Sequence, residues 1–195
     1  MEIAKDKVGI CGHYRMEVLR ADNIESAKSI MAKYGADSPE FKAIPRHLEG
    51  ISESDNRTTN EMLKRILDTV YHGTTQISPW YVGLFNTNTT PDGSETYDVP
   101  VFTEDVDYSS ATRPEYVEAA ASGAYKTTNT ASPATFTIVT GGQTIYGAAL
   151  FSTSTKGDHT AGANNVLGNC AKFGTSRAVI ATDVLNITYE ITAGV

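Results

Sequence analysis

Two short runs of alternating residues, joined by a pair of glycines, constrain the fold most strongly. In residues 133–140, apolar side chains such as Phe136 alternate with threonines, and a second run, 143–152, follows Gly141 and Gly142 directly. A period of two places the apolar side chains on one face of a strand. Adjacent glycines supply the positive φ that a two-residue hairpin turn requires. The sequence therefore predicts a β-hairpin that turns at the two glycines.

Further strands of this kind are expected along the chain. Clusters of turn residues separate them, of which Pro91-Asp92-Gly93 is the clearest because proline fixes φ and glycine admits positive φ. Short strands at this spacing are typical of an antiparallel β-sandwich or small barrel, either Ig-like or jelly-roll-like. The predicted strands are 8–20, 80–85, 116–125, 133–140, 144–151, 177–181 and 184–192.

The first 75 residues differ in character from the rest. Capping residues and apolar periodicity predict helices at 22–34 and 59–71, and the polar stretch 50–57 is predicted to be a loop. We therefore predict an α+β protein with two parts. Residues 1–75 would form an N-terminal strand with a two-helix arm or subdomain, and residues 76–195 would form the sandwich.

Charge and hydropathy exclude several function classes. The chain has 16 Lys and Arg against 23 Asp and Glu, a net charge of −7, and most of the excess falls after residue 75. Nucleic-acid binding needs clustered cations, so no nucleic-acid partner is expected. No stretch approaches 18 apolar residues, so no membrane partner is expected either. The two cysteines are far apart in the sequence and are expected to be buried free thiols.

The candidate reactive and metal-binding groups in the sequence each have a simpler interpretation. Cys11 and His13 would share one face of a strand, but no third group is placed to orient them. Oxygen-rich residues gather at 86–95 and 104–107, yet neither stretch has the spacing of a calcium loop. Solvated turns explain both acidic stretches more simply. We therefore expect no enzyme, no cofactor and no metal.

Several stretches resemble a group of small virion proteins of tailed bacteriophages. The similarity is good over residues 80–195 and weaker over 8–20, whereas 21–75 departs from the group by being more helical. The resemblance rests on four elements: Tyr108-Ser-Ser-Ala-Thr-Arg-Pro-Glu-Tyr116, Ser132-Pro-Ala-Thr-Phe-Thr-Ile138, Tyr146-Gly-Ala-Ala-Leu-Phe-Ser-Thr-Ser-Thr-Lys-Gly157 and Ser176-Arg-Ala-Val-Ile-Ala-Thr-Asp-Val-Leu-Asn-Ile-Thr-Tyr189.

The resemblance implies a non-enzymatic structural protein of the phage particle. A capsid cement or decoration protein is the favoured interpretation, with the major capsid protein as partner. The alternative is a tail component, namely an adaptor, nozzle-associated or fibre-anchoring protein that contacts portal or tail proteins. A homo-oligomer within the virion is expected in both cases. A glycan-binding module, with Trp80 and tyrosines stacked on sugars, is a more distant alternative.

Seven residues are candidates for protein contacts. Tyrosine and arginine are enriched in protein interfaces, long polar loops often form contact surfaces, and the helix at 59–71 has a wide apolar stripe that needs a partner. The candidates are Tyr108, Arg113, Tyr116, Lys156, His159, Met62 and Ile66.

Overall fold

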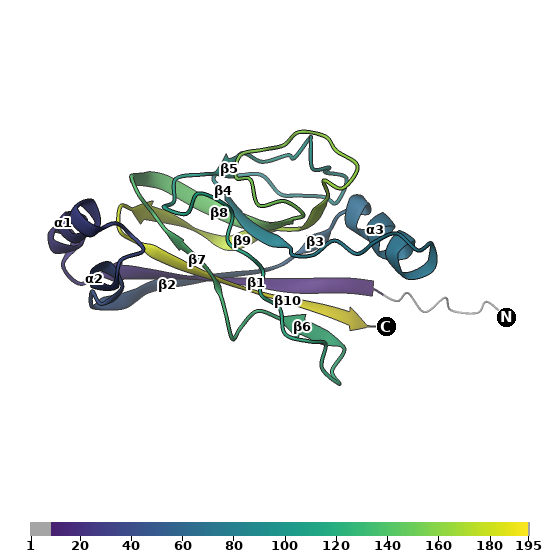
Figure 1. The fold of residues 1–195 in the computed structure, drawn as a ribbon, viewed down its shortest axis with the longest axis horizontal. Coiled ribbons are helices and arrows are strands. Elements are labelled where there is room, and N and C mark those ends of the chain that lie inside the picture. Colours follow the sequence, from purple (N-terminus) through teal and green to yellow (C-terminus); the bar gives the residue numbers. More distant parts are fainter. Residues whose placement is uncertain (1–8, 195) are drawn as a thin grey trace.

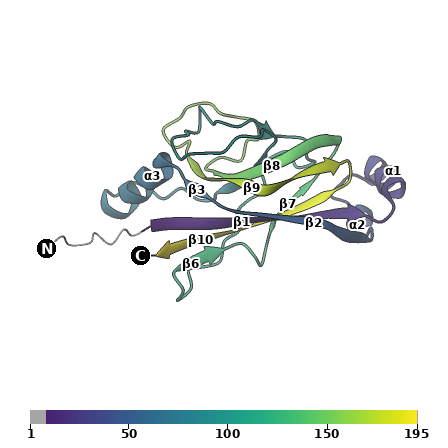
Figure 2. The same cartoon turned by 180° about the vertical axis from the view of Figure 1, so that it is seen from behind.

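The protein folds into two antiparallel sheets with short helices at the two ends (Figures 1 and 2). The structure, a computed structural model, describes residues 9–194. The helices are α1 (Ile24–Tyr34), α2 (Pro39–Lys42) and α3 (Asn60–Tyr71). The strands are β1 (Gly9–Ala21), β2 (Arg46–Asp55), β3 (Arg57–Thr58), β4 (Tyr81–Phe85), β5 (Glu104–Asp105), β6 (Lys126–Thr128), β7 (Ala134–Thr137), β8 (Gly141–Phe151), β9 (Leu167–Ile180) and β10 (Val184–Gly194).

The strand order defines the two sheets. The β1 sheet has the order β2-β1-β10-β6, and β7 also pairs with β10. The β8 sheet has the order β3-β9-β8-β4-β5. All the pairings are antiparallel, and buried side chains from both sheets form one cluster. The predicted antiparallel, sandwich-like α+β architecture is thereby confirmed in its coarse form.

The N-terminal strand is part of the sandwich rather than part of an arm. β1 pairs with the C-terminal strand β10 from Gly9↔Gly194 to Leu19↔Val184, and β2 pairs with the other edge of β1. The predicted division at residue 75 therefore does not separate two units.

The stretch 50–57, predicted to be a loop, lies largely in β2. Only Ser52 of this strand is fully buried, so the strand lacks the buried apolar residues from which a strand is predicted.

The predicted hairpin at Gly141–Gly142 is wrong in its pairing. β7 pairs with β10 in one sheet, and β8 pairs with β9 and β4 in the other, so the chain crosses between sheets at these glycines. Both glycines do have positive φ, 77° and 91°. A Cβ at Gly141 would lie 2.4 Å from the backbone nitrogen of Ala181, so the site also requires the absence of a side chain.

A second crossing, from β9 to β10, lies against the first. The Thr182 amide donates to the Ile138 carbonyl oxygen, and the Ile138 amide donates to the Asp183 carbonyl oxygen. Asp107 accepts hydrogen bonds from the backbone of Thr140 and Gly141, which holds the first crossing in place. The two glycines therefore sit at a corner of the sandwich where both sheet changes meet.

Other boundaries follow the sequence prediction with two exceptions. Residues 116–125, predicted to be a strand, are irregular, and the next strand is the short β6. The strand predicted at 177–181 is the end of a strand of 14 residues, β9, which begins at Leu167. The polar loop that carries the predicted contact residues Lys156 and His159 therefore ends at residue 166.

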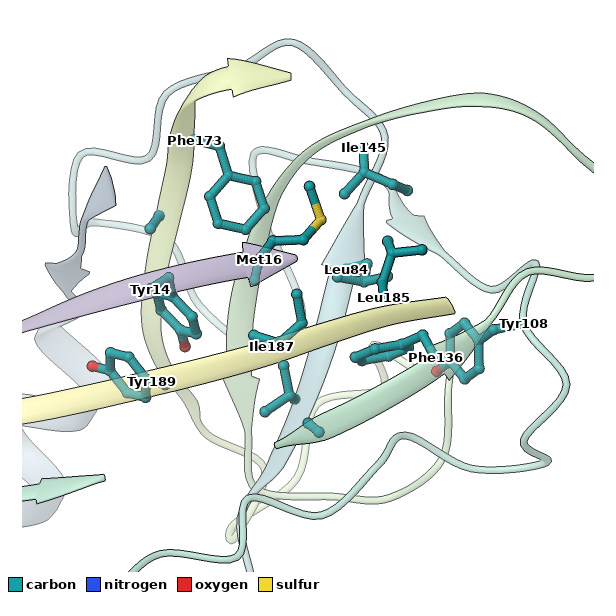
Figure 3. Packing of buried hydrophobic residues seen from close by; sticks show 14 of the residues in the cluster. Tyr14, Met16, Leu84, Tyr108, Phe136, Ile145, Phe173, Leu185, Ile187 and Tyr189 are labelled. Atoms are coloured by element: carbon teal, nitrogen blue, oxygen red, sulfur yellow. The ribbon is translucent and has the colours of Figure 1, made fainter. Parts of the chain in front are cut away.

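The main core lies between the sheets and is rich in aromatic side chains (Figure 3). Tyr14 of β1 and Tyr189 of β10 are opposite each other in the register and stack with ring centroids 3.9 Å apart. A Cβ at Gly12 would lie 2.7 Å from the Tyr189 hydroxyl, so glycine makes room for this ring. The alternation of apolar residues in β10 therefore reflects packing against β1 and across to the β8 sheet.

The helices lie at opposite ends of the long axis, with α1 and α2 at one end and α3 at the other (Figure 1). Asn23 caps α1 by accepting from the Ser26 amide, and Thr59 caps α3 by accepting from the Met62 amide. Within residues 9–194, no helix has the length and apolar character needed to cross a membrane.

Candidate functional site

Arg113 is the centre of a buried charged cluster. Its side chain is 1% exposed. Nε and Nη2 donate to the two carboxylate oxygens of Glu104, each at 2.7 Å, in a bidentate pair. The guanidinium carbon lies 4.0 Å from the centroid of the Phe151 ring, so the charge is packed against an apolar surface. Burial of this kind makes the pair depend on its hydrogen-bond partners.

Loop backbone and side chains satisfy the remaining groups of the cluster. Arg113 Nη1 donates to the backbone and hydroxyl oxygens of Thr153, and Nη2 donates to the Asp158 carbonyl oxygen. The Gly157 amide donates to Glu104 at 2.8 Å, and His159 Nε2 lies 3.4 Å from the same carboxylate. The cluster thereby fastens the loop 152–166 to the segment around β5.

The ionisation states fit a structural clamp. Burial by itself would raise the pKa of Glu104, but the hydrogen bonds from Arg113, His159 and the Gly157 amide hold that pKa below its ordinary value. Burial would likewise lower the pKa of Arg113, and its bonds to Glu104 raise it instead. Both groups therefore stay charged at neutral pH.

The neighbouring acidic groups behave in two ways. Asp105 is 2% exposed, its Oδ2 has no hydrogen-bond partner within residues 9–194, and burial raises its pKa. Asp107 instead accepts from the Thr140 and Gly141 amides and from the Gln143 side chain at 2.9 Å. Among residues 9–194, no group of three or more His, Cys, Asp or Glu side chains is arranged to hold a metal ion.

The other acidic stretch, 86–95, forms a closed turn. The Glu95 carboxylate accepts from the Asp92 and Gly93 amides, both at 2.7 Å, and Asp92 accepts from the Ser94 amide. These bonds occupy the oxygens that a cation would use.

Of Cys11 and His13, which the sequence does not favour as a reactive pair, the histidine has another partner. His13 Nδ1 lies 3.1 Å from the carboxylate of Asp55 on β2. The Cys11 thiol is exposed, contrary to the prediction of a buried thiol, whereas Cys170 is buried as predicted.

Three of the predicted contact residues are structural. Tyr108, Arg113 and Tyr116 are 3%, 1% and 2% exposed, so their side chains do not form a surface. The Tyr116 hydroxyl donates to the Tyr189 carbonyl oxygen, and the Tyr108 ring packs edge-on against Phe136. The prediction failed because tyrosine and arginine serve interfaces and buried polar anchors alike. The signal that could have indicated a buried pair is Glu104, nine residues before Arg113, which the sequence alone predicts to be part of a solvated turn.

Lys156 and His159 lie at the rim of the same cluster. Lys156 Nζ donates to the carbonyl oxygens of Val106 and Tyr108 and sits 4.3 Å from the Tyr108 ring centroid. His159 Nδ1 lies 3.1 Å from the Tyr97 carbonyl oxygen. Both side chains are half-buried and hold the loop, which leaves little of either for a partner.

Met62 and Ile66 are half-buried, and a neighbouring apolar stripe of α3 is more exposed. The first two line a groove of about 300 Å³ together with Val70, Ile77 and Trp80. The more exposed set, which we name the α3 stripe, has the i, i+4, i+7, i+8 spacing of one helix face. Its members are Leu63 at 41%, Leu67 at 57%, Val70 at 63% and Tyr71 at 82% exposed.

The helix that carries the stripe is held firmly by the sandwich. The Glu61 carboxylate accepts from the Tyr97 and Leu167 amides, each at 2.9 Å. Thr59 donates its hydroxyl to the Leu167 carbonyl oxygen, and Arg65 donates to the Ala163 carbonyl oxygen at 3.2 Å. The α3 stripe is therefore presented on a fixed helix. Sequence periodicity predicted an apolar face on this helix but not which part of it stays exposed.

Comparison with known proteins finds no matching family model and no matching curated protein. The similarity to phage virion proteins therefore remains a prediction from the four sequence elements.

Proposed function

We propose that this chain is a non-enzymatic structural protein of a bacteriophage particle that works through protein–protein contacts. The observation that carries the proposal is the α3 stripe, four exposed apolar side chains on a helix that is anchored at Glu61 and Thr59. Exposed apolar surface of this kind marks interaction sites. We favour capsid cement or decoration, with an Ig-like or jelly-roll-like sandwich as the scaffold and a homo-oligomer as the working form.

The positions of the resembling elements support this proposal. Tyr108, Arg113, Phe136 and Tyr189 from those elements are all buried, and Asp183 is 0% exposed at the crossing between β9 and β10. Such residues specify a scaffold, which explains how they can resemble a group without implying a reaction. Surface residues, which differ between proteins with one scaffold, would then determine the partner.

A tail component is the alternative within the same class. The α3 stripe would then dock on portal or tail proteins instead of capsid subunits.

The glycan-binding alternative receives less support. Trp80 is only partly exposed, it packs against the main core, and its ring lies 3.3 Å from the Cβ position of Gly168. A sugar-stacking platform needs one open face of the ring.

Particle composition tests the proposed function. We expect the protein in purified phage particles, with hundreds of copies for a capsid protein and about 6 to 18 for a tail protein. Quantitative mass spectrometry of the particles gives the copy number, and electron microscopy gives the location. Absence of the protein from purified particles would overturn the proposal.

Substitution within the α3 stripe tests its role in assembly. We expect Leu67→Lys together with Tyr71→Ser to weaken self-association or particle binding at least tenfold. Folding stability should change by less than about 0.5 kcal/mol, because both side chains are mostly exposed. Sedimentation velocity and particle co-sedimentation measure the first effect, and urea unfolding measures the second. Lys64→Ser on the same helix is the matched control, and unchanged association in the double variant would rule out the stripe as an interface.

A further inference from the structure

Two partly or fully buried arginines bind a carboxylate through the same edge of the guanidinium, and a third, Arg46, leaves that edge without an acceptor among residues 9–194. Arg113 uses its Nε and Nη2 edge to bind both oxygens of Glu104. Arg20 uses the same edge for Asp183, at 3.0 and 2.9 Å. The Nε and Nη2 atoms of Arg46 are also buried, but neither has a hydrogen-bond partner among the described residues. Buried polar groups are rarely left unpaired, so this edge calls for an acceptor.

The rest of the Arg46 side chain is held in place. Nη1 donates to the carbonyl oxygens of Phe41 and Ile44, at 3.2 and 3.1 Å, and the guanidinium lies 4.6 Å from the centroid of the Phe41 ring. Burial lowers the pKa of Arg46 from its ordinary value, and Asp183 opposes that effect from a distance. In the unbound protein Arg46 is therefore anchored through Nη1, and its other edge, of the kind that binds carboxylates, has no acceptor among residues 9–194.

Arg46 borders a groove of about 590 Å³ between α2 and one end of the β1 sheet. Leu19, Phe41, Ile44 and Val184 supply apolar surface, and the Lys42 ammonium adds a second positive charge. Hydroxyls line the far side, from Ser109, Ser110, Thr135 and Thr137. Asp37 is the one carboxylate among the residues that line this groove. The volume is that of a small-ligand or short-peptide site.

We propose that this groove binds an acidic side chain of a partner protein, with the Arg46 Nε and Nη2 edge gripping its carboxylate. The apolar surface would take the flanking aliphatic residues, and the hydroxyls would meet the peptide backbone. In the unbound protein both nitrogens lie below the surface of the groove, so binding turns the guanidinium outward and gives up the Nη1 bonds to Phe41 and Ile44. We choose the side chain of an aspartate or glutamate as the origin of this carboxylate. The reason is that the carboxylates of Asp183 and Glu104 bind the same edge of Arg20 and Arg113.

The Arg46 groove lies at the opposite end of the molecule from α3, since it is built partly by α2 (Figure 2). It is therefore a contact separate from the α3 stripe, and it does not depend on the protein being part of a virion. Failure of the groove proposal would leave the proposed function standing, and a protein absent from particles could still bind an acidic segment here.

Titration of the full-length protein with capped peptides tests the proposal. The probes are acetyl-Leu-Glu-Leu-amide, its Gln counterpart and acetyl-Leu-Leu with a free C-terminus, followed by NMR through the Nε–H signal of Arg46. We expect a saturable shift with the Glu peptide and at least tenfold weaker binding of the Gln peptide. The substitution Arg46→Gln should remove the binding, and Lys28→Gln on α1 should leave it unchanged. Tighter binding of the free C-terminal peptide would overturn the choice of a side-chain source, and no saturable Arg46 shift with any probe would overturn the site itself.

Asp37 provides a further check, because it could serve as an internal partner for Arg46. The variant Asp37→Asn should bind the Glu peptide at least as tightly as the unsubstituted protein, since it removes a nearby negative charge. Weaker binding by this variant would contradict the proposal. Because the signal of Arg46 is read directly in the unsubstituted protein, the test remains decisive even if Arg46→Gln fails to fold.

Discussion

Replacing Arg113 with methionine is expected to lower the free energy of unfolding by about 3–5 kcal/mol. The substitution keeps an apolar side chain against Phe151 but leaves the Glu104 carboxylate buried without its bidentate partner. An uncompensated buried charge is far more costly than a lost surface contact. The Asp158 carbonyl and both Thr153 oxygens would also lose a donor. Urea unfolding at pH 7, followed by circular dichroism, measures the change.

Two comparisons separate this mechanism from a general loss of packing. The double variant Arg113→Met with Glu104→Leu should be more stable than Arg113→Met alone, because both charges are then removed together. Arg15→Met, which breaks exposed ion pairs with Glu17 and Glu53, should cost less than about 1 kcal/mol. A loss below about 1 kcal/mol for Arg113→Met would show that the buried pair does not hold this region together.

Local sequence patterns predicted elements well and pairings poorly. The period of two in residues 133–140 and the positive φ at Gly141 were correct, because both depend only on neighbouring residues. The choice between a hairpin and a sheet crossing depends on what lies beside the turn. Here the turn lies against residues 180–183, which are distant in sequence. A single sequence carries no signal for that contact.

The same limit explains the error at the N-terminus. The alternation in residues 8–20 predicted a strand, and β1 confirms it over the described residues, although Val8 lies outside them. Nothing local indicated that this strand would pair with β10 along its whole length. β2 was missed because its outward face carries Glu53 and Asp55, so an edge strand has the composition of a loop.

The candidate contact residues divide along similar lines. Periodicity indicated that the helix 59–71 has more apolar surface than its own packing uses, and the exposed α3 stripe agrees with that. Residue type alone suggested Arg113 and Tyr108 as contacts, and tertiary burial makes them anchors instead. No sequence pattern singles out Arg46. Only the structure shows that one edge of its guanidinium has no acceptor among the described residues.

Gly147→Ala is expected to destabilise the protein by about 2–3 kcal/mol through overpacking. Gly147 lies in the middle of β8, opposite Phe85 of β4 and Lys172 of β9. An added Cβ would lie 2.0 Å from Cζ of Phe85 and 2.2 Å from the Ala171 carbonyl oxygen. The ring cannot move freely, because Phe85 is fully buried and stacks on Phe102 with centroids 4.5 Å apart. The backbone of β9 would have to move as well, which strains the sheet.

Gly123→Ala is the matched control for this substitution. Apart from its chain neighbours, no residue among 9–194 has an atom within 4 Å of the Cβ position at Gly123, and its φ is not in the left-handed region. The same chemical change should therefore be neutral there, or stabilise by up to about 1 kcal/mol through the unfolded chain. Thermal and urea unfolding of both variants give the comparison. Equal stability of the two variants would contradict the prediction. It would mean that β8 and β9 can move apart at Gly147 without a loss of stability, although the β8 sheet brings them into close contact there.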